Sequence, residues 1–390
     1  MKKEKSSRIL FSAVLVILAL GSVFMMSSCS KKEAGTIKIG AIFAETGPIA
    51  FLGEPEVKTA KMLVDQINAD GGIDGMQIEL VIKDSQANGD KAIAFANQLI
   101  EEEQVFAIIG PTSSGTSLAI KEICEEGQTI LMSCAAAEAI SNPVASYVFT
   151  TPQQDRYAVQ WVLKTMQEMG ISKIGFVYEG TGFGSGGLDQ VQKYAADYGV
   201  EIAIAESYSI SETDYTGILT KVKGENVEAV LNWAVFPAQS IIPKNMKQIG
   251  FDVPLFHSHG FGNIKYVETI GVEAAEGILF PCGRLLAAEQ LSSGDPQKKL
   301  LVEYKDDYES TYNEAVSTFG GHAYDALMIL VEAIDEVGAD KEKVRSYIEN
   351  LKNHAGTGGV YNYSKTDHNG LGMDSLVMYT VKNGEFVLYK

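Results

Sequence analysis

Val105–Ser117, VFAIIGPTSSGTS, joins a short apolar run to a loop that is rich in hydroxyl side chains. A continuous apolar run that ends at a turn is consistent with a strand buried on both faces of a parallel sheet. The loop matches the phosphate-binding pattern G-x-x-x-x-G-K-[ST], except that Thr116 stands where the pattern has lysine. That lysine contacts the β- and γ-phosphates, so its absence argues against a nucleotide site.

Apolar runs and helical patterns alternate through most of the chain. TIKIGAIF (36–43) predicts a strand, and apolar residues between Val57 and Ile67 recur on one helical face. The alternation starts again near residue 170 with SKIGFVYEG (172–180). Strands that alternate with helices indicate parallel sheets with both faces covered. We therefore expect an α/β fold of two Rossmann-like lobes, with a ligand cleft between them at the carboxyl ends of the strands.

The C-terminal region departs from this alternation in two places. Residues 298–351 are mainly helical in pattern. The final stretch, SLVMYTVKNGEFVLYK (375–390), predicts a hairpin that turns at Asn383-Gly384.

Composition excludes some classes of partner. The 390 residues are 46% apolar and 21% charged, which is ordinary for a globular protein. The formal net charge is −18. Binding to nucleic acid or to an anionic membrane surface requires clustered lysine and arginine, so no nucleic-acid partner is expected.

The first residues predict an export signal. MKKEKSSR is basic and ILFSAVLVILALG is apolar, the layout of a secretory signal, although the run is long enough for a membrane anchor to be the competing interpretation. Cys29 follows two small residues at the end of this run, which resembles a bacterial lipoprotein signal. Residues 1–28 are then the signal peptide, Cys29 is the lipidated residue, and residues 29–35 form a lipid-anchored tether.

Motifs for enzymes, metals and cofactors are weak. GFGSGG (182–187) matches G-x-G-x-x-G but begins several residues after its strand, and the G-x-S-x-G and H-E-x-x-H patterns do not occur. His257 and His259 alternate on a strand end and could touch one ligand, but two histidines alone would bind a metal weakly. Cys124, Cys134 and Cys282 have no disulfide or zinc spacing and are expected to be buried free thiols. We expect no catalysis, no metal and no cofactor.

The hydroxyl-rich loop is better suited to a carboxylate. A turn that enters a helix offers N–H donors and the positive end of the helix to an anion. Because this loop has no lysine, the expected ligand carries one diffuse negative charge. The alternative is that Ser113 or Ser114 only caps the helix. The two roles are compatible, because one hydroxyl can cap while the other binds.

Four stretches, one of them within the opening loop, carry a resemblance to a known family: ETGPIAFLG (45–53), INADGGIDG (67–75), IIGPTSSG (108–115) and ILMSCAAAEAI (130–140). Together with the export signal and the two lobes, they resemble the leucine/isoleucine/valine-binding family, the type I periplasmic-binding-protein-fold receptors of ABC importers. The resemblance implies that one lobe holds a small ligand, the other closes over it, and the closed form docks on an ABC permease.

The resemblance also implies domain limits and a location. The N-lobe is expected at 36–152 plus 284–356 and the C-lobe at 153–283 plus 357–390, since the chain of this family crosses the hinge three times. We expect a monomer at the outer face of the cytoplasmic membrane or in the periplasm, held by its lipid anchor.

Ligand-binding positions of the family can be carried over individually. The serine that grips the ligand carboxylate falls on Ser113 or Ser114, and a small residue that binds through its backbone falls on Ala135. Ala137 replaces a threonine that helps to bind the α-ammonium group. The remaining positions form the apolar walls: Leu52, Phe183, Trp233, Phe236 and Phe319.

His259 stands where amino-acid binders of this family have an acidic residue that pairs with the α-ammonium. An unpaired buried ammonium costs several kcal/mol. Three interpretations stay open: a small apolar amino acid, an organic acid without an α-amine such as an aromatic carboxylate, or an amino acid whose charge is matched by Asp155, Glu179 or Asp325. A more remote alternative is an extracytoplasmic ligand sensor.

Overall fold

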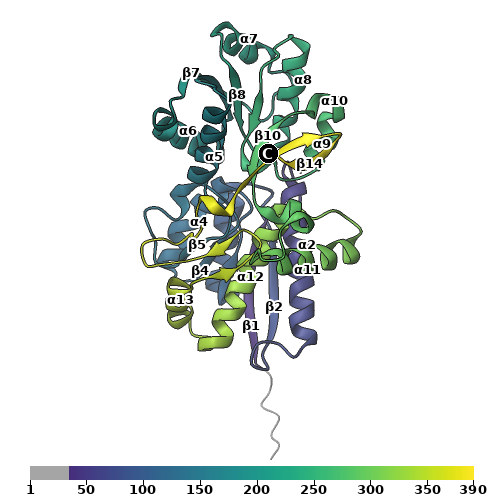
Figure 1. Ribbon diagram of the computed structural model, residues 1–390. Helices are drawn as coiled ribbons and strands as arrows, with labels where there is room; N and C mark the ends of the chain where they lie inside the picture. The colour runs from purple at the N-terminus through teal and green to yellow at the C-terminus, as the bar shows by residue number, and fades with distance from the viewer. Residues whose placement is uncertain (1–34) are drawn as a thin grey trace, which may run out of the picture.

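The computed structural model describes residues 35–390, which form two α/β lobes, one above the other in Figure 1. The expected signal peptide, Cys29 and residues 29–34 of the tether lie outside the described residues. The expected fold class is confirmed, since each lobe is built on its own sheet.

The first lobe has a five-stranded sheet in the order β2-β1-β3-β4-β5, in which every pair is parallel. Its strands are β1 (Thr36–Phe43), β2 (Gln77–Asp84), β3 (Ala107–Ile109), β4 (Ile130–Ser133) and β5 (Val148–Thr150). Its helices are α2 (Ala50–Ala69), α3 (Gly89–Asn97), α4 (Ser114–Glu126), α11 (Lys298–Tyr312), α12 (Thr318–Val337) and α13 (Lys341–Asn350).

Both faces of this sheet are covered, as the continuous apolar runs predict. Along β1 and β3, Ile39 and Ile109 pack into a core with α2 and α12, whereas Ile42 and Ile108 pack into a second core with α3 and α4. Side chains alternate between the faces of a strand with period two, so a strand buried on both faces is apolar along its buried length, as β1 is from Ile39 to Phe43.

The second lobe has a seven-stranded sheet in the order β14-β13-β10-β9-β8-β6-β7. Its strands are β6 (Lys173–Glu179), β7 (Glu201–Tyr208), β8 (Ala229–Trp233), β9 (Leu255–His257), β10 (Leu279–Cys282), β13 (Val377–Lys382) and β14 (Glu385–Leu388). Its helices are α5 (Asp155–Glu168), α6 (Gly182–Tyr194), α7 (Thr216–Gly224), α8 (Ile241–Gln248), α9 (Lys265–Ile270) and α10 (Val272–Ala275). Strands β6 to β10 are parallel, and β13 and β14 form the expected antiparallel hairpin at the edge.

The hairpin turn has the geometry that its two residues predict. Asn383 and Gly384 both have positive φ, 54° and 84°. A two-residue type I′ turn needs positive φ at both positions, which Asn-Gly supplies at the least cost.

One expected lobe boundary, at residues 356 and 357, is placed too early. Tyr361, Tyr363 and Leu371 are buried in the core of the first lobe with α12, and the Tyr363 hydroxyl donates to the backbone oxygen of Thr150 at 3.0 Å. The third crossing therefore falls after Leu371. The chain stays in the first lobe beyond residue 357 because a short hairpin docks on α12. This hairpin is formed by β11 (His354–Ala355) and β12 (Val360–Tyr361).

Cys124, Cys134 and Cys282 are buried and free, as expected. Among residues 35–390, none of the helices combines the length and the apolar character that a membrane span requires.

A matched pair of glycines tests the packing of α2 against β1. A Cβ atom added at Gly53 would lie 2.2 Å from the backbone oxygen of Ala44, whereas one added at Gly217, in the exposed part of α7, meets nothing within 4 Å. We expect Gly53→Ala to lower the free energy of unfolding by roughly 1–3 kcal/mol, the usual cost of overpacking. Gly217→Ala should raise it by roughly 0.5–1 kcal/mol. Urea titration of both variants measures the difference, and equal effects would contradict the described packing.

Candidate functional site

The carboxyl ends of strands from both sheets meet between the lobes. The first lobe contributes the loops that follow β3 and β4, and the second contributes the loops that follow β6, β8 and β9. Two adjoining cavities lie there, which we call the inner and the outer cavity. The inner cavity is lined by Thr112, Ser113, Ser114, Cys134, Ala135, Ala136, Phe183, Val235, His259, Gly260 and Phe319. The outer cavity is lined by Ala87, Gly89, Ser113, Ser114, Gly115, Thr116, Thr181, Phe183, Ile210, Val235 and Phe236.

The lobes touch each other around these cavities. Asn263 Nδ2 donates to the backbone oxygen of Phe51 at 3.0 Å, and Gln190 Nε2 donates to Glu138 Oε2 at 2.8 Å. The inner cavity measures only about 30 Å³ and the outer one about 320 Å³. A leucine-sized guest in the inner cavity therefore requires the lobes to part, which a hinged two-lobe fold permits.

The two serines at the start of α4 have different partners. Ser113 is the N-cap, and its Oγ accepts a hydrogen bond from the backbone N–H of Thr116 at 3.3 Å. Ser114 Oγ instead accepts from the backbone N–H of Ala137 at 3.3 Å, and its side chain is buried. Because the Ser114 hydroxyl only accepts in this contact, its own proton is free to donate to a carboxylate. Ser113 thus caps the helix, and Ser114 is the better placed of the two to bind.

The aromatic wall comes from the second lobe and is held by Glu179. The carboxylate of Glu179 accepts from the backbone N–H groups of Val235 and Phe236 at 3.0 and 2.9 Å, and from the Thr181 hydroxyl at 2.8 Å. It thereby ties the loop after β6 to the loop after β8. Phe183, in the first turn of α6 directly after the first of these loops, stacks on Trp233 with ring centroids 5.8 Å apart.

His259 is neutral in this site. Burial lowers its pKa to about 4, and a weaker interaction with the backbone of Gln153 works in the opposite direction. Its Nδ1 has no hydrogen-bond partner among the described residues. A neutral imidazole has one donor and one acceptor nitrogen, so His259 offers a ligand no net charge. His322 on α12 is also neutral, because burial and the neighbouring His259 lower its pKa to about 3.

Five buried carboxyl groups lie near the cavities or the hinge, those of Glu56, Glu138, Asp155, Glu179 and Asp325, and that of Glu138 is bonded to Gln190 and Arg156. Both oxygens of Glu179 and of Asp325 are occupied by donors of the chain. In contrast, Glu56 and Asp155 each have one oxygen, Oε1 and Oδ2, that lacks a partner in the part of the chain that the structure describes. Burial raises the pKa of Asp155 to about 7 and that of Glu56 well above its usual value.

Most residues that the sequence singles out come together here. Six of them line the inner cavity: Ser113, Ser114, Ala135, Phe183, His259 and Phe319. Phe236 lines the outer cavity. Leu52 and Trp233 do not line either cavity but belong to the apolar cluster behind them, together with Phe183 and Phe319. Ala137 is buried beside Ser114. Their roles in binding remain predictions.

Five further residues that line the inner cavity were not predicted from the sequence: Thr112, Cys134, Ala136, Val235 and Gly260. All five lie within three residues of the carboxyl end of β3, β4, β8 or β9. That position is itself a signal, since ligands of parallel sheets bind at this edge. His257, in contrast, lines neither cavity, and its Nδ1 lies 3.0 Å from Gln239 Oε1.

The GFGSGG segment serves the contact between the lobes. A Cβ atom at Gly182 would lie 3.2 Å from the Cα atom of Gly115, and one at Gly186 would lie 2.7 Å from Asp155 Oδ2. A side chain at Gly182 would meet the first lobe, whereas one at Gly186 would meet Asp155 of α5 within the second lobe, so both glycines are explained by close approach rather than by a dinucleotide.

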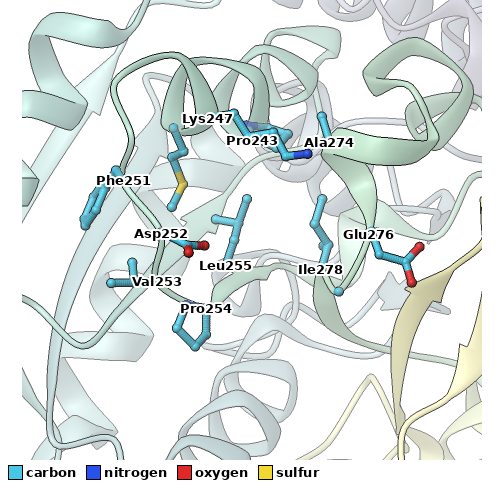
Figure 2. Close-up of a pocket in the computed structure, with 12 residues that line it drawn as sticks. Pro243, Lys247, Phe251, Asp252, Val253, Pro254, Leu255, Ala274, Glu276 and Ile278 are labelled. Carbon is cyan, nitrogen blue, oxygen red and sulfur yellow. The ribbon is translucent and has the colours of Figure 1, made fainter.

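A further hollow lies in the second lobe, away from the cleft (Figure 2). It is lined by residues that precede β9 and β10, among them Asp252 and Glu276, and by Lys247 on α8. The hollow therefore lies at the amino ends of the strands, the edge of the sheet opposite to the cleft. Residues 35–390 hold no group of three or more His, Cys, Asp or Glu side chains that could bind a metal ion.

The fold and this site define a two-lobed receptor that binds a ligand in its cleft. The profile of the family described as periplasmic binding protein matches residues 36–385, and the chain belongs to this family of binding proteins, which are not enzymes. The resemblance noted in the sequence is thereby confirmed.

Individual relatives agree with this assignment. A leucine-, isoleucine-, valine-, threonine-, and alanine-binding protein of Pseudomonas aeruginosa is 29% identical over 80% of this chain and 81% of its own. An extracellular ligand-binding receptor from Rhodopseudomonas palustris HaA2 has 25% identity and a TM-score of 0.85, over 90% of this chain and 99% of its own. The branched-chain amino acid transporter substrate binding protein LivJ of Streptococcus pneumoniae, solved with isoleucine, has 26% identity and a TM-score of 0.79, over 91% of this chain and 100% of its own.

The division of labour between the two serines is testable. Ser113→Ala should lower the free energy of unfolding by about 1 kcal/mol through the lost cap and should affect ligand affinity less. Ser114→Ala should weaken carboxylate binding by about ten- to a hundredfold, since a hydrogen bond to a charged group contributes roughly 1.5–3 kcal/mol. Thermal unfolding and calorimetry on both variants separate the effects. A larger affinity loss in Ser113→Ala would contradict the assignment.

Proposed function

We propose that this protein is the extracytoplasmic solute-binding component of an ABC importer of the branched-chain-amino-acid type, which closes on a small apolar amino acid and delivers it to the permease. The observation that carries the proposal is the inner cavity, where the N-terminus of α4 and the Ser114 hydroxyl face apolar and aromatic side chains of the other lobe. The names of the relatives point to the same class of ligand.

The two ends of the cavity suit the two ends of such a ligand. The helix end attracts a carboxylate. Phe183, Val235 and Phe319 offer an apolar surface, and full burial of a leucine-sized side chain is worth roughly 1.5–3 kcal/mol.

A second candidate is an organic acid that lacks the α-amine, such as an aromatic carboxylate. Neutral His259 and Ala137 favour it, because neither can neutralise an ammonium group. Both candidate ligands gain a similar free energy from burial of their apolar part, so their head groups decide which of them binds more tightly. The more remote alternative, an extracytoplasmic sensor, shares the site and differs in the partner that the closed form would contact.

A calorimetric screen tests the ligand class. Leucine, isoleucine and valine should bind, and 4-methylpentanoate, which is leucine without its amine, should bind less tightly. His259→Glu places a carboxylate at the cavity and should shift the preference further toward the amino acids, because it adds a counter-charge for the ammonium. Binding of 4-methylpentanoate or an aromatic acid in preference to leucine would establish the second candidate. If none of these compounds gives a heat of binding, the proposed function is wrong.

We also propose that the protein is a lipoprotein anchored through Cys29, at the outer face of the cytoplasmic membrane or in the periplasm. The basis is the basic and apolar signal that ends at this cysteine. Cys29→Ala should leave an unprocessed precursor without a diacylglyceryl group, as read by intact mass and detergent partitioning. Normal maturation and normal partitioning of this variant would contradict the anchor.

A further inference from the structure

One face of α6 runs along the first lobe. Gly182, Gly186 and Gln190 are spaced by four residues, so their side chains lie on the same face of this helix. A Cβ atom at Gly182 would lie 3.2 Å from the Cα atom of Gly115, and one at Gly186 would lie 3.6 Å from the Ala137 Cβ. The two glycines therefore let α6 approach the first lobe closely, and Gln190 supplies the long side chain that reaches across.

The partner of Gln190 is Glu138, which belongs to the first lobe and follows β4. Gln190 Nε2 donates to Glu138 Oε2 at 2.8 Å, and Arg156 Nη1, on α5 of the second lobe, lies 3.3 Å from Glu138 Oε1. Asn142 of the first lobe donates to the same Oε1 at 3.0 Å and so fixes the position of the carboxylate. Among the ion pairs formed by residues 35–390, that of Glu138 and Arg156 is the only one that joins the two lobes.

These contacts are largely shielded from water. Glu138 and Gln190 are only 8% and 7% exposed, and the guanidinium of Arg156 also packs over the ring of Tyr157, 4.5 Å from its centroid. An exposed ion pair contributes little to stability, whereas a shielded hydrogen bond to a charged group remains net favourable after exchange with water. Parting the lobes exchanges these bonds for bonds to water, so the contacts of Glu138 add to the cost of opening.

Glu138, Arg156 and Gln190 line neither the inner nor the outer cavity. Their contribution to the closed arrangement is therefore the same whichever ligand the cleft holds. We infer that these three side chains form a clasp between the lobes, which favours the closed form of the ligand-free protein and slows the release of any enclosed ligand. Because the clasp acts on closure and not on ligand identity, it goes beyond the proposed function and does not require the ligand to be an amino acid.

Another contact between the lobes differs from the clasp because it involves no charge. Asn263 Nδ2 donates to the backbone oxygen of Phe51 at 3.0 Å, a bond between a neutral donor and a neutral acceptor. A hydrogen bond between neutral groups is worth less than one to a charged group. The carboxylate of Glu138 also allows a test that a neutral contact does not, since a second negative charge placed against it repels it.

The substitution Gln190→Glu supplies that charge with a side chain of the same length. We expect it to lower the ratio of closed to open ligand-free protein by about ten- to a hundredfold, as measured by small-angle X-ray scattering. Dissociation of leucine, isoleucine and valine, followed by stopped flow, should become faster by a factor that is equal for the three. Gln192→Glu is the matched control, because Gln192 is an exposed residue of the same helix, and it should change neither quantity.

An exchange of the two side chains separates direct contact from a structural defect. The double variant Glu138→Gln with Gln190→Glu again places one amide and one carboxylate face to face. It should therefore be more closed, and release its ligand more slowly, than Gln190→Glu alone. Damage to α6 by the substitution at residue 190 would not be repaired by a change at residue 138, since rescue requires that the two positions interact.

The outcomes that contradict the clasp are distinct from those that contradict the proposed function. Unchanged scattering in Gln190→Glu, an equal effect of Gln192→Glu, unequal changes among the three ligands, or no rescue in the double variant would each overturn the clasp. If the unaltered protein binds none of the three amino acids, the proposed ligand is wrong. Scattering from the ligand-free variants then still decides whether the clasp holds the lobes together.

Discussion

The hinge depends on the buried carboxylate of Asp325. This side chain, on α12, accepts hydrogen bonds from the backbone N–H groups of Thr357 and Gly358 at 2.6 and 2.7 Å, and the Tyr361 hydroxyl lies 2.7 Å from it. The same hydroxyl is 2.6 Å from the backbone oxygen of Thr151, where the chain first leaves the lobe. Burial raises the pKa of Asp325, and the hydrogen bonds from these donors work in the opposite direction. Hydrogen bonds thus take the place that a cation would otherwise have beside this buried acid. One side chain thus joins α12 and the β11–β12 hairpin and, through the Tyr361 hydroxyl, the stretch where the chain first leaves the lobe.

Burial, rather than ion pairing, sets the electrostatics of the cleft. The side chains that line the inner cavity include no Lys, Arg, Asp or Glu among the described residues. His259 and His322 are neutral because burial lowers their pKa values to about 4 and 3. In such a site a single charged group has a large effect, since water cannot screen it. In the proposed function, discrimination between an amino acid and a simple carboxylic acid would therefore depend on the few buried acids nearby.

The sequence was sufficient for the fold and for most of the cavity, and the limits of that prediction have physical causes. Continuous apolar runs such as VFAIIG report burial on both faces directly, and residues that follow them must lie at the carboxyl edge of the sheet, which located Ser113 and Ser114, whereas Ala135 came from the family resemblance. The third hinge crossing was misplaced because the docking of residues 354–371 depends on Asp325, a contact between distant parts of the chain. Nor could spacing alone reveal which serine caps α4, or that Asp155 and not Glu179 has an unoccupied oxygen. Those properties depend on hydrogen bonds that cross between elements.

Closure of the lobes has an electrostatic cost that an anionic ligand can offset. α4 of the first lobe and α6 of the second both begin at the cleft, capped by Ser113 and Thr181, and the two starts approach so closely that Gly115 and Gly182 face each other. Helix N-termini carry partial positive charge, so two of them brought together repel. A carboxylate between them replaces this repulsion with two attractions, whereas an uncharged guest of the same shape does not. The proposed preference for a carboxylate and the proposed coupling of binding to closure would thus follow from one arrangement, in which a chain of net charge −18 provides a local positive field without a lysine or arginine in the lining of either cavity within residues 35–390.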